Sequence, residues 1–200
     1  MLKSRNLDIL LEAGTDEAGA GCGFGPVVAA SVIMPIDWFH PELNDSKKLT
    51  EKKREKLFDI ILKEALSYSI TEVSAEKIDD INILQARFLA MDQCLKSMSL
   101  KPEHVLIDGD KFYKTYPIPF TCVVKGDSTY TSIAAASVLA KVSRDRSMVE
   151  LAKQYDKWDI QKHKGYLTKR HIELIKENGL SELHRKTFCT NFIWTNLLLK

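Results

Sequence analysis

The chain has 200 residues and a formal net charge of +2; 44% of its residues are hydrophobic and 28% are charged. This composition is ordinary for a soluble globular protein with enough chain for a real core, and the small net charge does not by itself indicate a nucleic-acid partner. The four cysteines form no Cys-x-x-Cys pair, which argues against a zinc site, and we expect a cytoplasmic protein because the sequence shows neither a signal peptide nor a long apolar span.

Two apolar runs near the N-terminus predict strands at residues 7–13 and 27–34, and a glycine-rich stretch separates them. Asp16 and Glu17 are expected at the end of the first strand. As neighbours in a strand, their side chains should point to opposite faces of the sheet. The stretch that follows has glycine at alternate positions, namely Gly19, Gly21, Gly23 and Gly25.

This glycine-rich loop could be a solvated turn, since Asp and Gly dominate turns for backbone reasons. Four alternating glycines are more than a hairpin needs, however, and they would let backbone N–H groups approach an anion. The loop lacks the Gly-Lys-Ser/Thr of a Walker loop, and Phe24 stands where a dinucleotide fingerprint requires glycine. We therefore expect a loop that binds an anionic partner through its backbone.

A basic segment follows the second predicted strand. Lys47 and Lys48 lie in Asp-Ser-Lys-Lys-Leu at 45–49, and Thr50 is a good N-cap for a helix that runs to about residue 66. Local basic patches can bind phosphate even where carboxylates elsewhere cancel the total charge. The basic residues further along the segment are better explained as a solvated helix face.

Strands and helices alternate in the middle of the chain, and helices alone are expected after residue 156. Further strands are predicted at 67–73, 104–109 and 119–124. Helices are predicted as a short turn from residue 74 or 75 and at 82–98, 131–155, 168–177 and 190–198. We infer an α/β core over residues 1–155 and a C-terminal helical region over residues 156–200 that packs on this core.

Acidic residues stand at or just past the ends of three predicted strands. Asp16 and Glu17 belong to the first, and Asp108 and Asp127 to the strands at 104–109 and 119–124. Functional sites form at strand ends in open α/β sheets, so a chance set of surface acids is the less attractive alternative. Carboxylates brought together need cations, and hard oxygen ligands select magnesium or manganese. No motif for a covalent nucleophile is present, so we expect metal-activated water to attack phosphate, with two metal ions stabilising the transition state.

The order of these motifs resembles the ribonuclease HII family. The matching motifs are Asp-Glu-x-Gly-x-Gly at 16–21, Asp-Ser-Lys-Lys-Leu at 45–49, Ile-Asp-Gly at 107–109, Lys-Gly-Asp at 125–127, a long-helix signature at 132–146, His-Lys-Gly-Tyr at 163–166 and His-Arg at 184–185. Each motif is weak alone, but together and in this order they are specific.

The resemblance implies an α/β fold with an RNase H-like mixed central sheet flanked by helices and with a C-terminal helical appendage. It implies an endoribonuclease that hydrolyses the RNA strand of RNA–DNA hybrids and incises on the 5′ side of ribonucleotides embedded in duplex DNA, leaving 5′-phosphate and 3′-hydroxyl ends, as in ribonucleotide excision repair. It also implies Mg²⁺ or Mn²⁺ as cofactors, nucleic acid rather than a membrane as the partner, and a monomeric enzyme.

The resemblance also assigns roles to matching positions. The catalytic metal ligands would be Asp16, Glu17, Asp108 and Asp127, and the nucleic-acid contacts would be Gly19, Ala20, Gly21, Lys47, Lys48 and Tyr166. In the family the tyrosine meets the ribonucleotide junction, whereas a tyrosine in such a loop is ordinarily a packing residue with a solvated hydroxyl. For His163 and His184 we expect structural hydrogen bonds, and phosphate contacts stay open.

Two positions of the glycine-rich loop depart from the family. Ala20 replaces an arginine, which removes a phosphate contact while keeping the backbone donors, and Cys22 replaces a proline. A thiol at position 22 could be reactive or a passive replacement.

Other classes of protein stay open. A non-catalytic module that binds hybrids would not need four strand-end acids, and a magnesium-dependent phosphatase would not need Lys47, Lys48 and Tyr166. The related type III enzymes usually carry an extra N-terminal domain, for which there is little room before Asp16.

Overall fold

The computed structural model describes residues 2–7, 11–113, 115 and 117–197, with the side chains of 192–197 excepted. A five-stranded sheet in the order β3-β2-β1-β4-β5 forms its centre. The central strand β1 pairs antiparallel with β2 and parallel with β4, and the outer pairs β2–β3 and β4–β5 are antiparallel and parallel. The strands are β1 (Glu12–Ala18), β2 (Val27–Ile33), β3 (Ser67–Val73), β4 (His104–Asp108) and β5 (Phe120–Val123).

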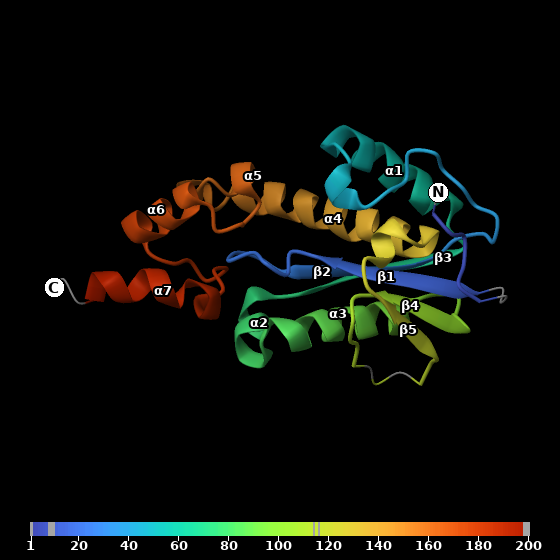
Figure 1. The fold of residues 1–200 in the computed structure, drawn as a ribbon. Coiled ribbons are helices and arrows are strands. Elements are labelled where there is room, and N and C mark those ends of the chain that lie inside the picture. Colours follow the sequence, from blue (N-terminus) through green and yellow to red (C-terminus); the bar gives the residue numbers. More distant parts are fainter. Residues whose placement is uncertain (1, 8–10, 114, 116, 198–200) are drawn as a thin grey trace.

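Helices cover both faces of this sheet, so the predicted mixed sheet with flanking helices is confirmed (Figure 1). Apolar residues of α1 and α4 pack on one face, and those of α3 pack on the other. The helices are α1 (Glu51–Glu64), α2 (Ala75–Ile81), α3 (Ile83–Ser97), α4 (Thr131–Ala152), α5 (Ile160–His163), α6 (Lys169–Asn178) and α7 (Lys186–Leu197), with 3-10 turns η1 (Ser46–Lys48), η2 (Gly126–Ser128) and η3 (Asp156–Trp158).

The long helix α4 approaches β1 closely because small residues line the contact. Ala134, Ala135 and Ala136 are fully buried, as the sequence pattern predicts. A Cβ atom on Gly14 would overlap the backbone of Ser132, so only glycine fits at this crossing. The close approach brings the side chains of α4 to the acid-bearing end of β1.

The first strand is where the sequence prediction is wrong. The apolar pattern predicts a strand at 7–13, but β1 begins at Glu12; residues 8–10 lie outside the described part of the chain. The Glu12 carboxylate accepts the backbone N–H of Asn6 at 2.7 Å, so Asn6 lies next to the start of β1. The paired acids of the first motif are therefore ladder residues inside the strand rather than residues beyond its end.

The remaining predicted elements are confirmed with shifted ends. The first helix ends at Glu64, because Ala65 is already extended and leads into β3, and the long helix ends at Ala152, because a turn follows it; both ends come earlier than the apolar pattern predicts. The last helix begins earlier than predicted, at Lys186, and residue 198, where its predicted end falls, lies outside the described part of the chain.

The helices α5 to α7 lie beyond one end of the sheet, beside the glycine-rich loop (Figure 1). Two isolated bridges join the regions, one between Cys22 and Tyr166 and one between Phe24 and His184. The division of the chain at residue 155 remains a prediction. Across the described residues, we find no helix with the length and apolar character that a membrane crossing requires.

Candidate active site

Four carboxylates gather at one edge of the sheet, and we call Asp16, Glu17, Asp108 and Asp127 the acidic tetrad. The first two lie on β1, the third is the last residue of β4, and the fourth lies in η2 just after β5. The strands β1, β4 and β5 are parallel neighbours, so their carboxyl ends meet at the same edge. The sheet topology therefore brings together the acids that the sequence singles out.

The two acids on β1 reach the site from opposite faces of the sheet. Asp16 faces α4 and accepts a hydrogen bond from Ser137, whose hydroxyl lies 2.7 Å from that of Ser46 in the basic loop. Glu17 faces α3, where its Oε1 atom lies 2.7 Å from Nε of Arg87. Sequence reasoning missed Arg87, because a single arginine inside an amphipathic helix gives no signal of a partner on a distant strand.

The other two acids are joined through the turn that follows β5. Oδ1 of Asp108 accepts the backbone N–H of Gly126 at 2.8 Å and that of Asp127 at 3.4 Å. Oδ2 of Asp127 lies 3.8 Å from Nζ of Lys47, so the basic loop reaches the tetrad directly. Asp108 is thus fixed by the turn that carries Asp127.

Burial and mutual repulsion raise the pKa values of three acids of the tetrad. Burial raises the pKa of Asp16 well above its usual value, and the charges of Glu17 and Asp108 raise it further. Burial also raises the pKa of Glu17, although Arg87 opposes the shift. Burial and the charge of Asp108 raise the pKa of Asp127. Each shift means that the ionised carboxylate is costly without a further positive charge nearby.

The tetrad fits a hard divalent cation by donor type and by charge. All of its donors are oxygen atoms, which magnesium and manganese prefer. Oε2 of Glu17 is buried and has no hydrogen-bond partner among the described residues, so it is an oxygen atom that could bind a cation. As the side chains lie, no three His, Cys, Asp or Glu residues in the described part of the chain could enclose an ion, since Glu17 is drawn to Arg87 and Asp108 to its turn.

The predicted basic contacts lie beside the tetrad. Burial lowers the pKa of Lys47, but Asp16 and Asp127 outweigh it, and the net pKa is raised. The Lys47 side chain is still 78% exposed, so it can meet a ligand from solvent. Nζ of Lys48 donates to the Ser128 hydroxyl at 3.1 Å, which places it at the η2 turn.

The sequence predicts a loop that presents its backbone N–H groups to an anion, but part of this backbone is bonded inside the protein. The N–H of Gly23 donates to Gly165 O at 2.9 Å, and the N–H of Gly25 donates to Leu183 O at 2.9 Å. No hydrogen bond within the described residues takes the N–H of Ala20 or Gly21. Only the front half of the loop is therefore available to an anion.

Two buried arginines hold this loop by hydrogen bonds to its carbonyl oxygens. Sequence reasoning missed both of them. Arg144 donates to the carbonyl oxygens of Phe24, Pro26 and Lys164 at 2.8 to 3.2 Å. Arg185 donates to the carbonyl oxygens of Gly25 and Ala20 at 3.0 and 3.1 Å. Both belong to motifs of the family resemblance, but the sequence could not show that they serve the loop.

The cysteines behave as packing residues. Cys22 is fully buried, and burial raises the pKa of its thiol, so the structure favours passive replacement over a reactive thiol. Cys94 is in the core, whereas Cys122 is only half-buried. All four cysteines lie in the described part of the chain and are free.

Tyr166 borders the front half of the loop, and the residue is 45% exposed. It pairs with Cys22 through a backbone bridge, and Nζ of Lys141 lies 5.9 Å from the centre of its ring. The purely structural alternative for this tyrosine is weakened by that exposure, because a packing residue would be covered.

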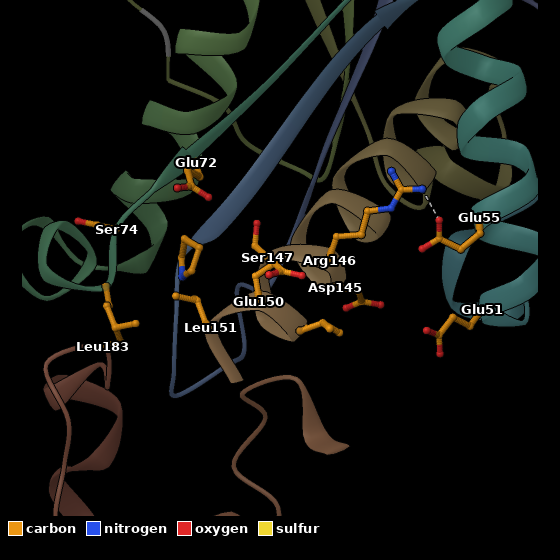
Figure 2. Close-up of a pocket in the computed structure, with 13 residues that line it drawn as sticks. Glu51, Glu55, Glu72, Ser74, Asp145, Arg146, Ser147, Glu150, Leu151 and Leu183 are labelled. Carbon is orange, nitrogen blue, oxygen red and sulfur yellow. Dashed lines mark hydrogen bonds and ion pairs between the residues drawn. The ribbon is translucent and has the colours of Figure 1, made fainter. Parts of the chain in front are cut away.

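A cavity of about 720 Å³ lies elsewhere, and Figure 2 shows its lining residues running from α1 across α4 to Glu72 and Ser74 just before α2. Glu55 on α1 reaches Arg146 on α4 across it, and Pro26 and Leu183 contribute apolar lining. The cavity contains no member of the tetrad. The acids instead line a sheet edge, which suits a long polymer better than a small enclosed substrate.

Comparisons with known proteins find similar sequences and similar folds. The sequence model of the family "Ribonuclease HII" matches residues 13–196. Ribonuclease HII of Bacteroides thetaiotaomicron is 52% identical over 179 residues, which cover 90% of this chain and 90% of that protein. The crystal structure of ribonuclease H2 from Pyrococcus horikoshii has a TM-score of 0.77 at 26% identity and covers 92% of this chain and 97% of that one. Ribonuclease HII of Archaeoglobus fulgidus, solved in complex with PCNA, has a TM-score of 0.70 at 27% identity, with the same coverage of 92% and 97%.

Proposed function

The chain belongs to the ribonuclease HII family, and we propose that its acidic tetrad performs the phosphodiester hydrolysis of that family. The protein is an endoribonuclease that hydrolyses the RNA strand of RNA–DNA hybrids and incises on the 5′ side of ribonucleotides in duplex DNA, leaving 5′-phosphate and 3′-hydroxyl ends. The observation that carries the assignment of residues is the meeting of strand-end acids from β1, β4 and the turn after β5.

Enzymes of this family are metal-dependent, and we propose Mg²⁺ or Mn²⁺, in a pair, as the ions that the tetrad holds. When bound, such ions lower the pKa of water and stabilise charge on the attacking and leaving oxygens. The chain's own contribution is orientation. Ser137 fixes Asp16 from α4, Arg87 fixes Glu17 from α3, and the η2 turn fixes Asp108.

We propose that the substrate lies across the tetrad between the basic loop and the glycine-rich loop. Lys47 would neutralise a phosphate near the acids, and Lys48 would contact the backbone next to it. The open N–H groups of Ala20 and Gly21, together with Gly19, would meet the ribose hydroxyl, which alone distinguishes RNA from DNA at one position. Tyr166 would stack at the ribonucleotide junction.

The other classes explain fewer of these features. A non-catalytic hybrid-binding module gives no reason for three buried acids with raised pKa values at one sheet edge. A phosphatase for small substrates gives no reason for a largely exposed lysine and an exposed tyrosine on either side of them. A cytoplasmic monomer remains our expectation.

The test is cleavage of three duplexes of one sequence: all-DNA, DNA with a single ribonucleotide, and an RNA–DNA hybrid. With Mg²⁺ we expect incision of the last two and binding without cleavage of the first, and with excess EDTA no incision of any. Similar cleavage of all three duplexes would instead indicate a general nuclease, and full cleavage in EDTA would refute metal ligation by the tetrad.

A further inference from the structure

We propose that His171 and His184 form a neutral hydrogen-bonded relay that positions Tyr166, and that they are therefore positioning residues of the reaction. The proposal rests on the proposed contact of Tyr166 with the ribonucleotide. The relay runs from the Ser181 turn through His184 and His171 to the backbone of Tyr166. It crosses from the C-terminal helices to the loop that borders the active site.

The hydrogen bonds permit only one arrangement of protons on neutral rings. The backbone N–H of Ser181 must donate, and its nitrogen lies 2.9 Å from Nδ1 of His184, so Nδ1 is an acceptor; the Ser181 hydroxyl, 2.8 Å from the same atom, must then donate to it as well. The proton of His184 is then on Nε2, which lies 3.2 Å from Nε2 of His171. His171 must accept there and carry its own proton on Nδ1, which lies 3.0 Å from the carbonyl oxygen of Tyr166. That oxygen can only accept, so the relay closes without conflict.

Burial keeps both rings neutral. His171 and His184 are 0% and 1% exposed, and a second proton on either would point one N–H at another. His163 stacks on His171 with ring centres 4.1 Å apart, which also disfavours a positive charge there. In agreement, burial lowers the pKa of both His171 and His184 to about 4. Among the described residues, Glu182 is the acid whose charge acts on the pair, and its effect on the His184 pKa is the smallest of the causes.

The relay fixes Tyr166 by its backbone, while its side chain is half-exposed, hydrogen-bonds with Cys22 and lies beside Lys141. The carbonyl oxygen of Tyr166 accepts from His171 and also from the N–H of Thr168 at 2.8 Å, while its own N–H donates to His163 O at 3.0 Å. Its neighbour Gly165 accepts the N–H of Gly23 at 2.9 Å. With the backbone held at both polar groups, the direction in which the exposed ring leaves the loop is set in advance. Such preorganisation lowers the cost of meeting a ligand.

The alternative is that the relay only stabilises the fold. A double-mutant cycle distinguishes this structural role from the positioning of Tyr166. We expect His171→Leu, which removes the donor to Tyr166, to lower kcat/KM for the single-ribonucleotide duplex by about tenfold or more, as a misplaced contact residue would. His171→Asn keeps a side-chain N–H near the position of Nδ1 and should recover most of that loss. Tyr166→Ala should produce a loss of its own, and adding His171→Leu to it should produce little more, because both act on one contact.

His104→Leu is the matched control. His104 is equally buried, bonds to Glu12 and Thr121 on the sheet, and does not contact the relay. The His104→Leu variant should lower the melting temperature as His171→Leu does. The loss of kcat/KM caused by Tyr166→Ala should be the same with and without His104→Leu. Additive losses from His171→Leu and Tyr166→Ala would overturn the relay. Normal activity of the Tyr166→Ala variant would instead overturn the proposed role of Tyr166. If the unmodified enzyme did not cleave the hybrid with a divalent metal ion, the proposed function itself would be overturned.

A measurement on the unmodified protein does not depend on whether the variants fold. Long-range ¹⁵N–¹H NMR spectra of the histidine rings distinguish the two neutral tautomers. We expect His171 with its proton on Nδ1 and His184 with its proton on Nε2 at pH 7. The opposite tautomer in either ring, or a charged ring, would break the relay and refute the proposal.

Discussion

The acids at the sheet edge must stay ionised to bind cations, but their burial makes the ionised state costly. Arg87 and Lys47 are the cations that reach them, and one carboxylate oxygen of Glu17 has no partner within the described residues. The negative charge of the tetrad is therefore only partly balanced. Substitutions here should separate catalysis from stability, since the same charges that serve the reaction burden the fold.

Asp16→Asn should abolish cleavage while the fold persists. A lost metal ligand costs several kcal/mol of transition-state stabilisation, which corresponds to about a thousandfold or more in rate. The melting temperature should not fall, because the substitution removes a charge that Glu17 and Asp108 repel. The measurement is single-turnover cleavage with a thermal melt, and Asp80→Asn on the exposed face of α2 is the control. Near-normal turnover at saturating Mg²⁺ would show that Asp16 is not a ligand.

Arg87→Met should make the protein depend more strongly on divalent cations. Without the guanidinium, Glu17 loses its partner at 2.7 Å and remains buried beside Asp16, so the metal-free protein should melt at a lower temperature. Mg²⁺ should then raise the melting temperature by more than it does in the unmodified protein, because binding to the folded state adds stability. Lys77→Met on the surface of α2 serves as the control. Equal shifts with Mg²⁺ in both proteins would contradict the argument.

Ala20→Arg should strengthen substrate binding in a salt-dependent way. An arginine at this front position of the loop can meet a phosphate, and each neutralised phosphate adds about one unit to the slope of log affinity against log salt. Preference for the ribonucleotide should not change, because phosphate contacts position rather than specify. Hybrid-binding titrations at several salt concentrations measure the slope. If affinity and slope stay the same, position 20 does not face the nucleic-acid backbone.

At the level of elements, the glycine-rich loop is a joint between the sheet and the C-terminal helices. Its carbonyl oxygens accept from two buried arginines, and half of its glycine N–H groups are bonded to the C-terminal region. Gly19 has a φ of +92°, and a Cβ atom there would overlap the Arg144 side chain. The glycines at the two ends of the loop thus serve different purposes, which pattern alone does not distinguish.

Gly19→Ala should destabilise the protein by about 2 kcal/mol or more, because the residue adopts a positive φ and the added methyl group displaces Arg144. Gly21→Ala is the matched control, since a Cβ atom there meets nothing within 4 Å. Its free energy of unfolding should stay nearly the same, while its hybrid affinity should fall if the open loop approaches the substrate closely. Urea unfolding and binding titrations test both. Equal stability of the two variants would be inconsistent with the loop geometry.

At the level of the whole molecule, the C-terminal helices hold a buried histidine cluster that the α/β core does not need for its own packing. Phe24 from the glycine-rich loop packs edge-on against His184, with ring centres 4.9 Å apart. This contact couples the protonation of the cluster to the attachment of the helical region. Acid should therefore weaken the molecule first at this junction.

The free energy of unfolding should fall as the pH decreases from about 6.5 to about 4. The pKa values of His171 and His184 are lowered to about 4, so in this range the unfolded chain binds protons that the folded protein excludes. Each such residue contributes a loss of about 1.4 kcal/mol per pH unit at most. Asp16, Glu17 and Asp127 act in the opposite direction, because acids with a raised pKa favour the folded state as the pH falls.

His184→Asn isolates the histidine contribution, since it removes one titrating ring and leaves the tetrad intact. The variant should lose less stability between pH 7 and pH 5 than the unmodified protein, by urea unfolding at each pH. His40→Asn, outside the cluster, should follow the unmodified curve. Parallel curves for His184→Asn and the unmodified protein would mean that the ring titrates normally in the folded state.

The sequence alone determined most of the elements and the members of the tetrad. The spacing of apolar residues and the capping residues predict helices such as α1, whose N-cap is Thr50, because these signals are local in the sequence. The acids were recognisable because each stands near a strand end with glycine close by, a pattern that neighbouring residues define. The family resemblance added the activity that the comparisons support.

Only the tertiary structure decided which residues serve those acids and the loop. The start of β1 depends on strand pairing with β2 and β4, so an apolar run before it was misleading. The contacts of Arg87 with Glu17, of Arg144 with the loop and of His171 with His184 join residues from different elements. No sequence period records which side chains from separate elements will meet, because that depends on how the sheet and helices pack in three dimensions.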